Sequence, residues 1–342
     1  MVAMLEGGML SPRRWRLESP EVASNAPAAR VATIVIALLG ACLAKPARAS
    51  ITVLVGEPYD TFGTLLPIGH ATIYLDRICA DGPLRVRMCE PGESPGVALS
   101  RYNHIGPYDW MATPIMQFLY ATSRADEAMQ TTTPNLVDDL RQQYRHDFLG
   151  NLFPDDSDRS QSNDEWWESV GMAYSRRLWG YQIATTRSQD EQFVAMINAR
   201  PNHHRYSAYH RNCANFAADM VNFYYPGLVK RNRLADLGFL LPKQVACSVY
   251  LYGKSHPGAQ LKVIEIPQVP GTIPRSHTTR GGAETFLKTK RYVVPLTLIQ
   301  PEIVASLLVV YLDSGRWSVG RPAEILKPES IQQVSESLLA KK

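Results

Sequence analysis

The sequence predicts an α+β fold in which a small antiparallel sheet packs against helices. Short runs rich in β-branched residues, separated by Gly- and Pro-bearing turns, dominate residues 50–102. From residue 115 onward, apolar residues recur instead at helical steps of three and four. Hydrophobic residues make up 45% and charged residues 20% of the 342-residue chain, a globular composition that provides a substantial core.

Residues 1–49 have the pattern of a targeting segment. Arg30 precedes an apolar run over 31–44, and an Ala-Arg-Ala cleavage site follows at 47–49. We therefore expect an exported, periplasmic protein. Two alternatives stay open: an uncleaved apolar run would anchor the chain in the membrane, and Cys42 follows Leu-Gly-Ala as in a bacterial lipoprotein box, which would make it a lipidation site.

The formal net charge of +4 comes mostly from this segment. Residues 1–49 hold six basic and three acidic side chains, so the 36 basic and 32 acidic residues of the whole chain fall to 30 and 29 in the remainder, a net charge of +1. Nucleic-acid binding depends on a strongly basic surface, so nucleic acid is not an expected partner. The oligomeric state stays open.

The strands come first along the mature chain. Residues 51–55 are a β-branched run, 69–75 form a second strand that begins at His70, and 96–102 form a third. A short run at 84–88 is expected to pair with the second strand. Together these runs predict the small antiparallel sheet.

Helical patterns follow, each with its own start signal. Thr133-Pro134 opens one helix, and Ser188-Gln-Asp-Glu191 is a capping box for another. The apolar run over 292–312 is interrupted by Pro295, Gln300, Pro301 and Glu302, which favours a strand and a packed helix over a membrane span. The expected helices are 115–121, 134–144, 166–178, the one after the capping box, 242–252 and a tail from 328; a further strand is expected at 261–266.

Cys213 stands where a loop turns into a helix. Phe216, Met220 and Tyr224 follow at helical steps, and Asn212 is a good N-cap, so the cysteine falls in the first turn. Unpaired N–H groups and the positive end of the helix dipole favour a thiolate there, and such helix starts lower a thiol pKa from about 8.5 to about 3.5–7.5. The alternative is a buried structural cysteine.

The remaining cysteines bear on whether this thiol is free. Cys79 and Cys89 flank Ala-Asp-Gly-Pro, a turn between two strand-like runs, and an oxidising compartment permits disulfides. We therefore predict a Cys79–Cys89 bridge. A Cys213–Cys247 disulfide is the alternative pairing that would abolish the nucleophile.

Cysteine catalysis also needs a base and a group that orients it. His70 is the best-placed base because it heads a strand of the sheet on which the cysteine helix would pack; the alternative is a strand-end histidine without a chemical role. For the orienting group we expect His104 first, then Asn103 and Asp109, because their polar loop follows the sheet. Asn103 and Asp109 are also candidate substrate contacts.

An oxyanion site and a metal site are the remaining options near the cysteine. Tyr206 and Asn212 are the candidates for oxyanion or substrate contacts, with simple packing as the alternative for the tyrosine. His203, His204 and His210 crowd the same approach, but their spacing fits no standard zinc pattern. We expect neither a metal nor another cofactor.

Two windows resemble a known family. Tyr206-Ser-Ala-Tyr-His-Arg-Asn-Cys-Ala-Asn-Phe resembles the cysteine motif of the lecithin–retinol acyltransferase-like group, in which a tyrosine precedes Asn-Cys-x-x-Phe by the same interval. His70-Ala-Thr-Ile-Tyr-Leu resembles the histidine strand of that group, and histidine precedes cysteine, as in permuted NlpC-type papain-like proteins. The resemblance implies a papain-like fold of circularly permuted order, a Cys213 nucleophile and a His70 base. It also implies acyl transfer, lipid deacylation or peptide or amide cleavage, and the exported context is similar to that of bacterial periplasmic relatives.

The chain departs from the family at two places. Arg85 and Arg87 stand where the family usually has a second histidine, and Ala214 and Asn215 follow the cysteine where the acyltransferases carry Glu and His. We expect an exported cysteine hydrolase or acyltransferase that acts on amide or ester bonds of cell-envelope peptides or lipids through a thioester acyl-enzyme. The alternative, favoured by the missing histidine, is a non-catalytic envelope binding or structural module on the same fold.

Three regions follow from these patterns. We expect a targeting segment over 1–49, a papain-like core over 50–227 and a C-terminal α/β extension over 228–342 that packs on the core. The apolar segment over 111–120 favours a lipid-facing mouth, with a place in the core as the alternative, so peripheral membrane contact stays open.

Overall fold

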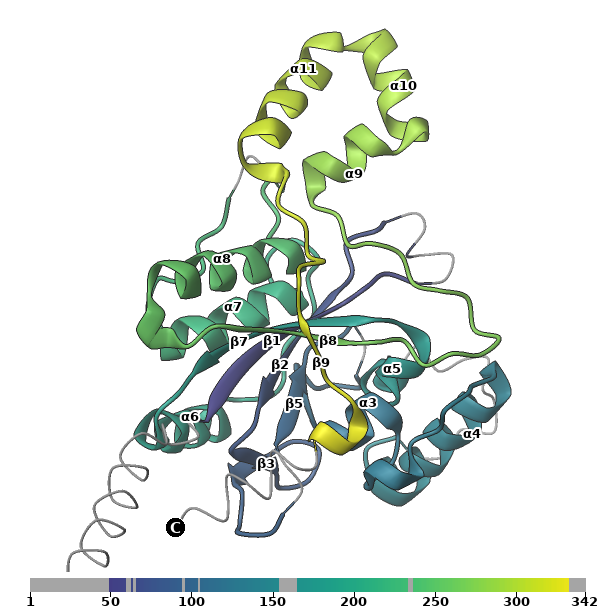
Figure 1. Ribbon diagram of the computed structural model, residues 1–342, viewed down its shortest axis with the longest axis vertical. Coiled ribbons are helices and arrows are strands. Elements are labelled where there is room, and N and C mark those ends of the chain that lie inside the picture. Colours follow the sequence, from purple (N-terminus) through teal and green to yellow (C-terminus); the bar gives the residue numbers. More distant parts are fainter. Residues whose placement is uncertain are drawn as a thin grey trace, which may run out of the picture. The chain divides into compact units, whose positions relative to one another are not determined.

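The computed structural model describes residues 49–59, 63, 66–93, 96–103, 105–153, 165–232 and 236–331. The fold is α+β, with helices on both faces of a seven-stranded sheet (Figure 1). Strands lie in the order β6-β5-β2-β1-β7-β8-β9, and all neighbours are antiparallel except β8 and β9. The strands are β1 (Ser50–Gly56), β2 (His70–Leu75), β5 (Val97–Ser100), β6 (Met111–Pro114), β7 (Leu178–Ala184), β8 (Lys262–Ile266) and β9 (Glu324–Ile325).

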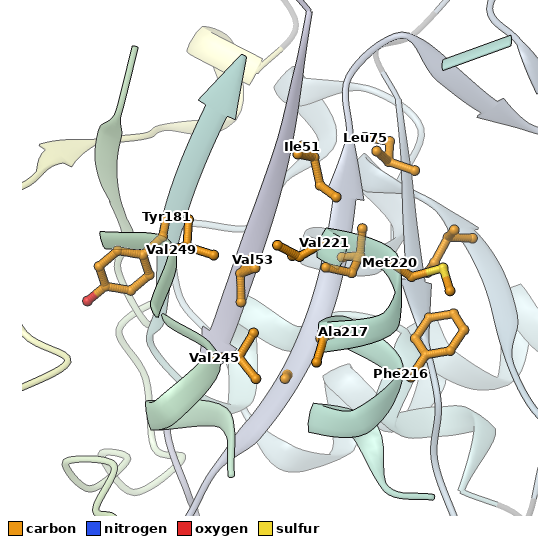
Figure 2. Close-up of a cluster of buried hydrophobic side chains, with 14 of the residues drawn as sticks. Ile51, Val53, Leu75, Tyr181, Phe216, Ala217, Met220, Val221, Val245 and Val249 are labelled. Carbon is orange, nitrogen blue, oxygen red and sulfur yellow. The ribbon is translucent and has the colours of Figure 1, made fainter. Parts of the chain in front are cut away.

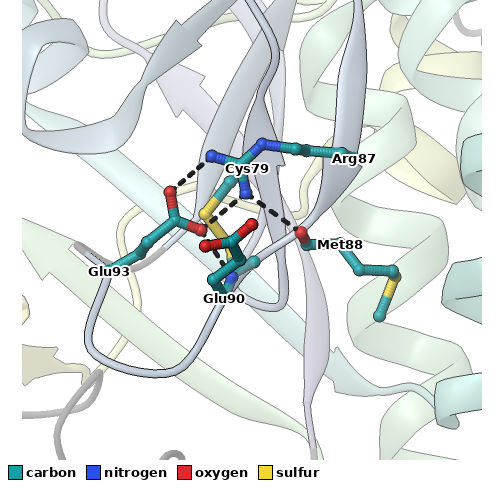
Figure 3. Close-up of a disulfide and its surroundings, with 6 residues drawn as sticks. Cys79, Arg87, Met88, Glu90 and Glu93 are labelled. Atoms are coloured by element: carbon teal, nitrogen blue, oxygen red, sulfur yellow. Dashed lines mark hydrogen bonds and ion pairs between the residues drawn. A yellow bond between two sulfur atoms is a disulfide. The ribbon is translucent and has the colours of Figure 1, made fainter.

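A separate hairpin, β3 (Ile78–Ala80) and β4 (Val86–Met88), stands beside the main sheet. The expectation that 84–88 pairs with the second strand was wrong, because β4 pairs with β3, while β5 takes the place beside β2. The structure joins Cys79 and Cys89 in a disulfide across this hairpin (Figure 3). Cys79 pairs with Arg87 in the hairpin, and Cys89, just after β4, lies close enough for the bridge, with 4.9 Å between the two Cα atoms.

Side chains alternate along the central strands between two apolar layers. Val53, Ala71 and Ile73 belong to the layer that packs against α7, whereas Leu54 and Tyr74 belong to the layer on the other face. Because both faces of β1 are covered, its residues are buried without exception, which explains why apolar residues on it face both layers.

The helices over the first face are α6 (Arg187–Ala199), α7 (Cys213–Tyr224) and α8 (Pro242–Ser255). Figure 2 shows Ala217 and Val221 of α7 and Val245 of α8 directed at Val53 of β1. Val221 is 0% exposed, and burial of a valine side chain contributes about 1.5–3 kcal/mol. This packing fixes α7, and therefore Cys213, against the centre of the sheet.

The opposite face is covered by shorter helices. α3 (Ile115–Tyr120) is buried at every position, and β6 before it is almost wholly buried. The expectation of a lipid-facing mouth over 111–120 was therefore wrong, and this segment is core. The other helices on this side of the chain are η1 (Ala125–Glu127), α4 (Pro134–Tyr144), η2 (Arg145–Leu149), η3 (Trp166–Ser169) and α5 (Met172–Ser175).

Two predictions for helices need correction. The helix expected over 166–178 is instead η3, α5 and the beginning of β7, because Gly171 takes a left-handed conformation with φ 68° that interrupts it. The capping box of α6 is formed by Thr186 and Gln189, two residues before the predicted one. The first segment does contain helical turns, and α6 does begin with a capping box, but the bounds of both differ from the predicted ones.

The region after residue 227 completes the same core and sheet. α8 packs on β1 and β7, and β8 extends the sheet beyond β7. The strand and packed helix expected over 292–312 were wrong: the structure has two largely exposed helices, with Pro301 at the first turn of the second, where its missing N–H costs nothing. The remaining elements are η4 (Pro257–Ala259), α9 (Gly282–Lys288), α10 (Lys290–Ile299), α11 (Pro301–Val310) and η5 (Tyr311–Gly315).

Among the described residues, no helix combines the length and apolar character required to cross a membrane. The predicted tail helix begins at residue 328 and passes out of the described residues after 331.

Candidate functional site

A cavity of about 470 Å³ lies where the start of α7 meets the start of β2 and the end of β5. Cys213 and His70 both line it, as do the sequence-predicted residues Asn103, Tyr206 and Asn212. Its wall also includes charged and aromatic residues that sequence reasoning did not select: Tyr59, Arg101, Tyr102, Glu165, Glu168 and Arg176.

Asn212 holds the start of α7 in place. Its side-chain oxygen accepts the Asn215 N–H at 2.9 Å, while the Asn215 side chain accepts the Asn212 N–H at 3.2 Å, which completes a capping box. The Asn212 amide also donates to the carbonyls of Ala208 and Leu240, at 2.8 and 3.0 Å. Because every polar atom of this side chain is engaged, Asn212 positions the cysteine rather than offering a free donor to a substrate.

Cys213 is a free thiol and is 7% exposed. Burial raises the pKa of the Cys213 thiol, although hydrogen bonds from the backbone N–H groups of Ala71, Ala214 and Cys213 itself, together with the charge of Arg101, oppose that rise. The expectation of a lowered pKa was therefore wrong in direction, because loss of hydration outweighs the helix start. The alternative bridge to Cys247 is absent, since that residue is also a free thiol.

His70 is enclosed but not bonded to the thiol. Its ring stacks on Tyr102 at 4.2 Å between centroids, and its Nε2 is buried without a hydrogen-bond partner. Burial, followed by the charge of Arg176, lowers the pKa of His70 well below its usual value, so the imidazole is neutral. Within the described residues, no hydrogen bond joins it to Cys213.

The alternation of β2 explains this separation. Ala71 shares the α7 side of the sheet with Cys213 and donates its N–H to the sulfur, whereas the preceding residue His70 stacks on Tyr102, which belongs to a cluster with Met111 and Trp166 away from α7. The two side chains therefore enter one cavity from opposite sides of the strand end.

Arg101 lies directly behind the start of α7. Its guanidinium donates to Asp109 at 2.6 Å and to the Asn212 carbonyl at 3.5 Å, and it stacks over the Phe216 ring at 4.9 Å. Asp109 also accepts from Arg211 at 2.9 Å. Asp109 does not line the cavity, and its carboxylate is held by two arginines rather than by a histidine.

The wall opposite the cysteine carries a second charged cluster. Arg176 donates to Glu168 at 2.5 Å and stacks over Tyr59 at 4.1 Å. Burial, followed by the charge of Glu168, raises the pKa of Glu165 to about 7, and hydrogen bonds from Asn103 oppose the rise. Asn103 thus binds Glu165 rather than His70.

The strand beside the histidine strand carries no second histidine. That strand is β5, and the residue that meets His70 is Tyr102, two residues after β5 ends, whose hydroxyl donates to the Glu168 carbonyl at 2.6 Å. Sequence reasoning compared β4 instead, where Arg87 binds Glu93 at the disulfide hairpin (Figure 3). A strand-like run, Val-Ala-Leu-Ser, that leads into Arg-Tyr-Asn at 101–103 was the available signal, but strand order could not be read from it.

Tyr206 is half-buried beside the cysteine. Burial, followed by the nearby Cys213 and Glu165, raises the pKa of Tyr206, so its hydroxyl remains a proton donor. His203 and His204 line a neighbouring open groove with Tyr108. The first-choice orienting residue, His104, lies outside the described residues.

Metal-ligand geometry gives no support for a zinc site at the cysteine. Among the described residues, the group of three potential ligands that lie close together is Cys79, Cys89 and Glu93, and its two sulfurs are joined in the disulfide.

Comparisons with known proteins give one distant structural similarity. No protein-family model matches the chain, and no curated protein matches it. The crystal structure of the type VI secretion system effector TseH aligns with 64% of this chain and 98% of its own, at 12% sequence identity and a TM-score of 0.29. The α+β description of this chain accordingly rests on its own strands and helices.

Proposed function

We propose that this chain is an exported cysteine hydrolase or acyltransferase with a permuted papain-like arrangement, acting on amide or ester bonds of cell-envelope peptides or lipids. One observation carries the proposal. Cys213 stands at the start of α7 in a cavity that His70 also lines, and the backbone N–H groups of Ala71 and Ala214 oppose the rise of its thiol pKa. Backbone donors of this kind stabilise the charge that develops on sulfur or on a substrate oxygen.

In the proposed reaction, the Cys213 sulfur attacks a carbonyl carbon while His70 accepts the thiol proton. The tetrahedral oxyanion is held by backbone N–H groups at the helix start and by the Tyr206 hydroxyl. Collapse of the tetrahedral intermediate expels the amine or alcohol, which takes the proton from His70, and leaves a thioester. Water or a second acceptor then releases the acyl group.

The charge states of the two groups define the type of catalysis. Because the Cys213 pKa is raised and the His70 pKa is lowered, both groups begin neutral, and proton transfer accompanies attack rather than preceding it. Such transfer requires a separation of about 2.6–3.2 Å or one bridging water. His70 must therefore leave its stacking on Tyr102, or act through water, when substrate binds.

The cavity wall favours a substrate with an apolar portion. Large apolar side chains line one part of it, and the Glu168–Arg176 pair and Glu165 line another. An acyl chain or apolar peptide side chain would occupy the first part, with polar groups of the substrate in the second. The apolar residues are Leu66, Ile68, Leu237, Phe239, Leu241 and Phe286.

Intact-mass spectrometry with an acyl-directed electrophile tests the nucleophile. The expected result is one adduct on the wild type, none on Cys213→Ala, and full labelling of the matched control Cys247→Ala, which removes the other free thiol. Equal labelling of wild type and Cys213→Ala would contradict the proposal. Turnover of envelope lipids and peptidoglycan fragments, measured for wild type, Cys213→Ala and His70→Ala, then separates the two reaction classes.

A non-catalytic envelope binding module is the second candidate. The observation that favours it is the His70 imidazole, which stacks on Tyr102 and makes no bond to the thiol. On this reading, Cys213→Ala retains ligand binding while the wild type shows no turnover on any fragment. Loss of turnover in both Cys213→Ala and His70→Ala would exclude it.

A further inference from the structure

The α10–α11 pair presents an apolar surface that no other described element covers. α10 has no buried residue, and Leu307 is the one buried residue of α11. Leu298 and Ile299, at the end of α10, are 80% and 76% exposed. We call the following six residues the apolar tip: Val294, Leu298, Ile299, Ile303, Leu308 and Val309, each 39–80% exposed.

Six large apolar side chains exposed to this extent indicate a binding surface. Scattered single apolar residues are normal on a protein surface, but these six lie on two ten-residue helices that contact each other. Figure 1 shows α10 continuing from α9 and α11 as its neighbour, and each of the three helices contacts the other two. The six residues therefore belong to one pair of contacting helices rather than to two separate parts of the chain.

The two ends of the pair indicate which occupant fits. Lys290, Arg291 and Tyr292 begin α10, and Tyr311 follows α11. The end of α9, two residues before α10 begins, lies close to Tyr311, because Lys288 Nζ is 5.5 Å from the centre of the Tyr311 ring. Tyrosines beside basic side chains, at the border of an apolar segment, are the arrangement found where proteins meet lipid headgroups.

Polar groups within the pair are compatible with contact with lipid. The Thr297 hydroxyl donates to the Val293 carbonyl at 2.6 Å, and the Ser306 hydroxyl donates to the Glu302 carbonyl at 2.8 Å. Each helix has ten residues and is therefore about 15 Å long, half of the roughly 30 Å hydrocarbon core. Gln300 and Glu302 at the connection favour shallow, interfacial insertion, because a carboxylate is costly in hydrocarbon.

We propose that the apolar tip docks this protein on the surface of a lipid bilayer. The basic residues at its base then face anionic headgroups, and the tyrosines lie at the headgroup level. Thr285 and Phe286 of α9 line the cavity that holds Cys213, so docking places a wall of that cavity next to the membrane. This inference goes beyond the proposed chemistry and does not require Cys213 to be reactive.

Flotation of the full chain with vesicles tests the proposal. The probes are vesicles of phosphatidylcholine with 30% phosphatidylglycerol and of phosphatidylcholine alone. The variants are Leu298→Asp/Ile299→Asp on the tip and the matched control Leu251→Asp, which is 56% exposed on α8. Since the N-terminal apolar run also favours lipid, each variant is compared with wild type and not with zero binding.

The tip variant should need about tenfold or more lipid for half-maximal binding, because it loses two apolar side chains that docking would bury in the bilayer. The control should bind as the wild type does, and both variants should keep the wild-type melting temperature, since their positions are exposed. Equal binding of tip variant and wild type would overturn the proposal. So would a wild-type dimer in sedimentation that the tip variant dissociates without any change in flotation, which would assign the surface to a second copy of this chain. Loss of labelling at Cys213 has no bearing on either result.

Discussion

Replacement of Asp109 by alanine should destabilise the fold and disturb the start of α7. The Asp109 carboxylate is buried and binds Arg101 at 2.6 Å and Arg211 at 2.9 Å. Arg101 is itself 5% exposed, and its other polar contact is the Asn212 carbonyl at 3.5 Å. Asp109→Ala therefore leaves a buried guanidinium without its counter-charge.

The size of the effect follows from which arginine loses its partner. Removing one member of a buried ion pair costs about 3–5 kcal/mol, because the remaining charge stays desolvated. Arg211 is 36% exposed at its side chain and is hydrated without Asp109, so it adds little. We expect a loss of about 3 kcal/mol in the free energy of unfolding.

Urea denaturation followed by circular dichroism measures this loss. With a slope of about 3 kcal/mol per molar urea, the midpoint should fall by about 1 M. The matched variant Arg211→Gln breaks only the exposed half of the network and should cost about 1 kcal/mol or less. A loss below about 1 kcal/mol for Asp109→Ala, or an equal loss for both variants, would refute the reasoning.

Three further predictions concern other groups. Cys79→Ala/Cys89→Ala should lose about 2.5–3 kcal/mol of unfolding free energy, since the bridge closes a loop of sequence separation 10; urea denaturation of the variant and of reduced wild type should agree. Burial raises the pKa of Asp76 to about 6 in the folded protein, so the folded state binds this proton more tightly than the unfolded state does. The free energy of unfolding should therefore be highest near pH 4 and fall by about 3 kcal/mol as the pH rises to about 7. Asp76→Asn should remove this slope in urea titrations at pH 4–7, and an unchanged slope would contradict the assignment. Iodoacetamide labelling of Cys213 should be slow at pH 7 and accelerate above pH 9, because burial raises its pKa; fast labelling at pH 6, followed by mass spectrometry of the peptide, would indicate a thiolate instead.

Patterns among neighbouring residues predicted the helix and the strand that carry Cys213 and His70. Which other residues these two contact depends on strand order, which the patterns do not show. The N-cap Asn212 and the apolar steps after it predicted α7, and a β-branched run predicted β2 with His70 at its start. Periodicity and capping are properties of neighbouring residues, so one sequence is enough to show them.

The contents of the cavity were not predictable in the same way. Arg101 meets the start of α7 across 111 positions of sequence, and Tyr102 meets His70 because β5, not β4, lies beside β2. The pKa of Cys213 likewise depends on how deeply α7 is buried, which the helix-start pattern does not reveal. Contacts between segments that are distant in the sequence decided all three.

The position of β1 in the sheet has a consequence for the timing of folding. β1 is the first strand of the sheet to be synthesised, but its neighbour β7 is complete only at residue 184. The strand on the other side of β7, β8, follows only at residues 262–266. A chain emerging from the ribosome therefore cannot close its central sheet until most of it has been synthesised, and pairings this distant in sequence form slowly. For a protein that we propose is exported, this delay keeps the nascent chain unfolded, and able to cross a membrane, for longer. A fragment ending at residue 227 would lack α8 and β8 and would leave the outer edge of β7 open to pairing with other chains.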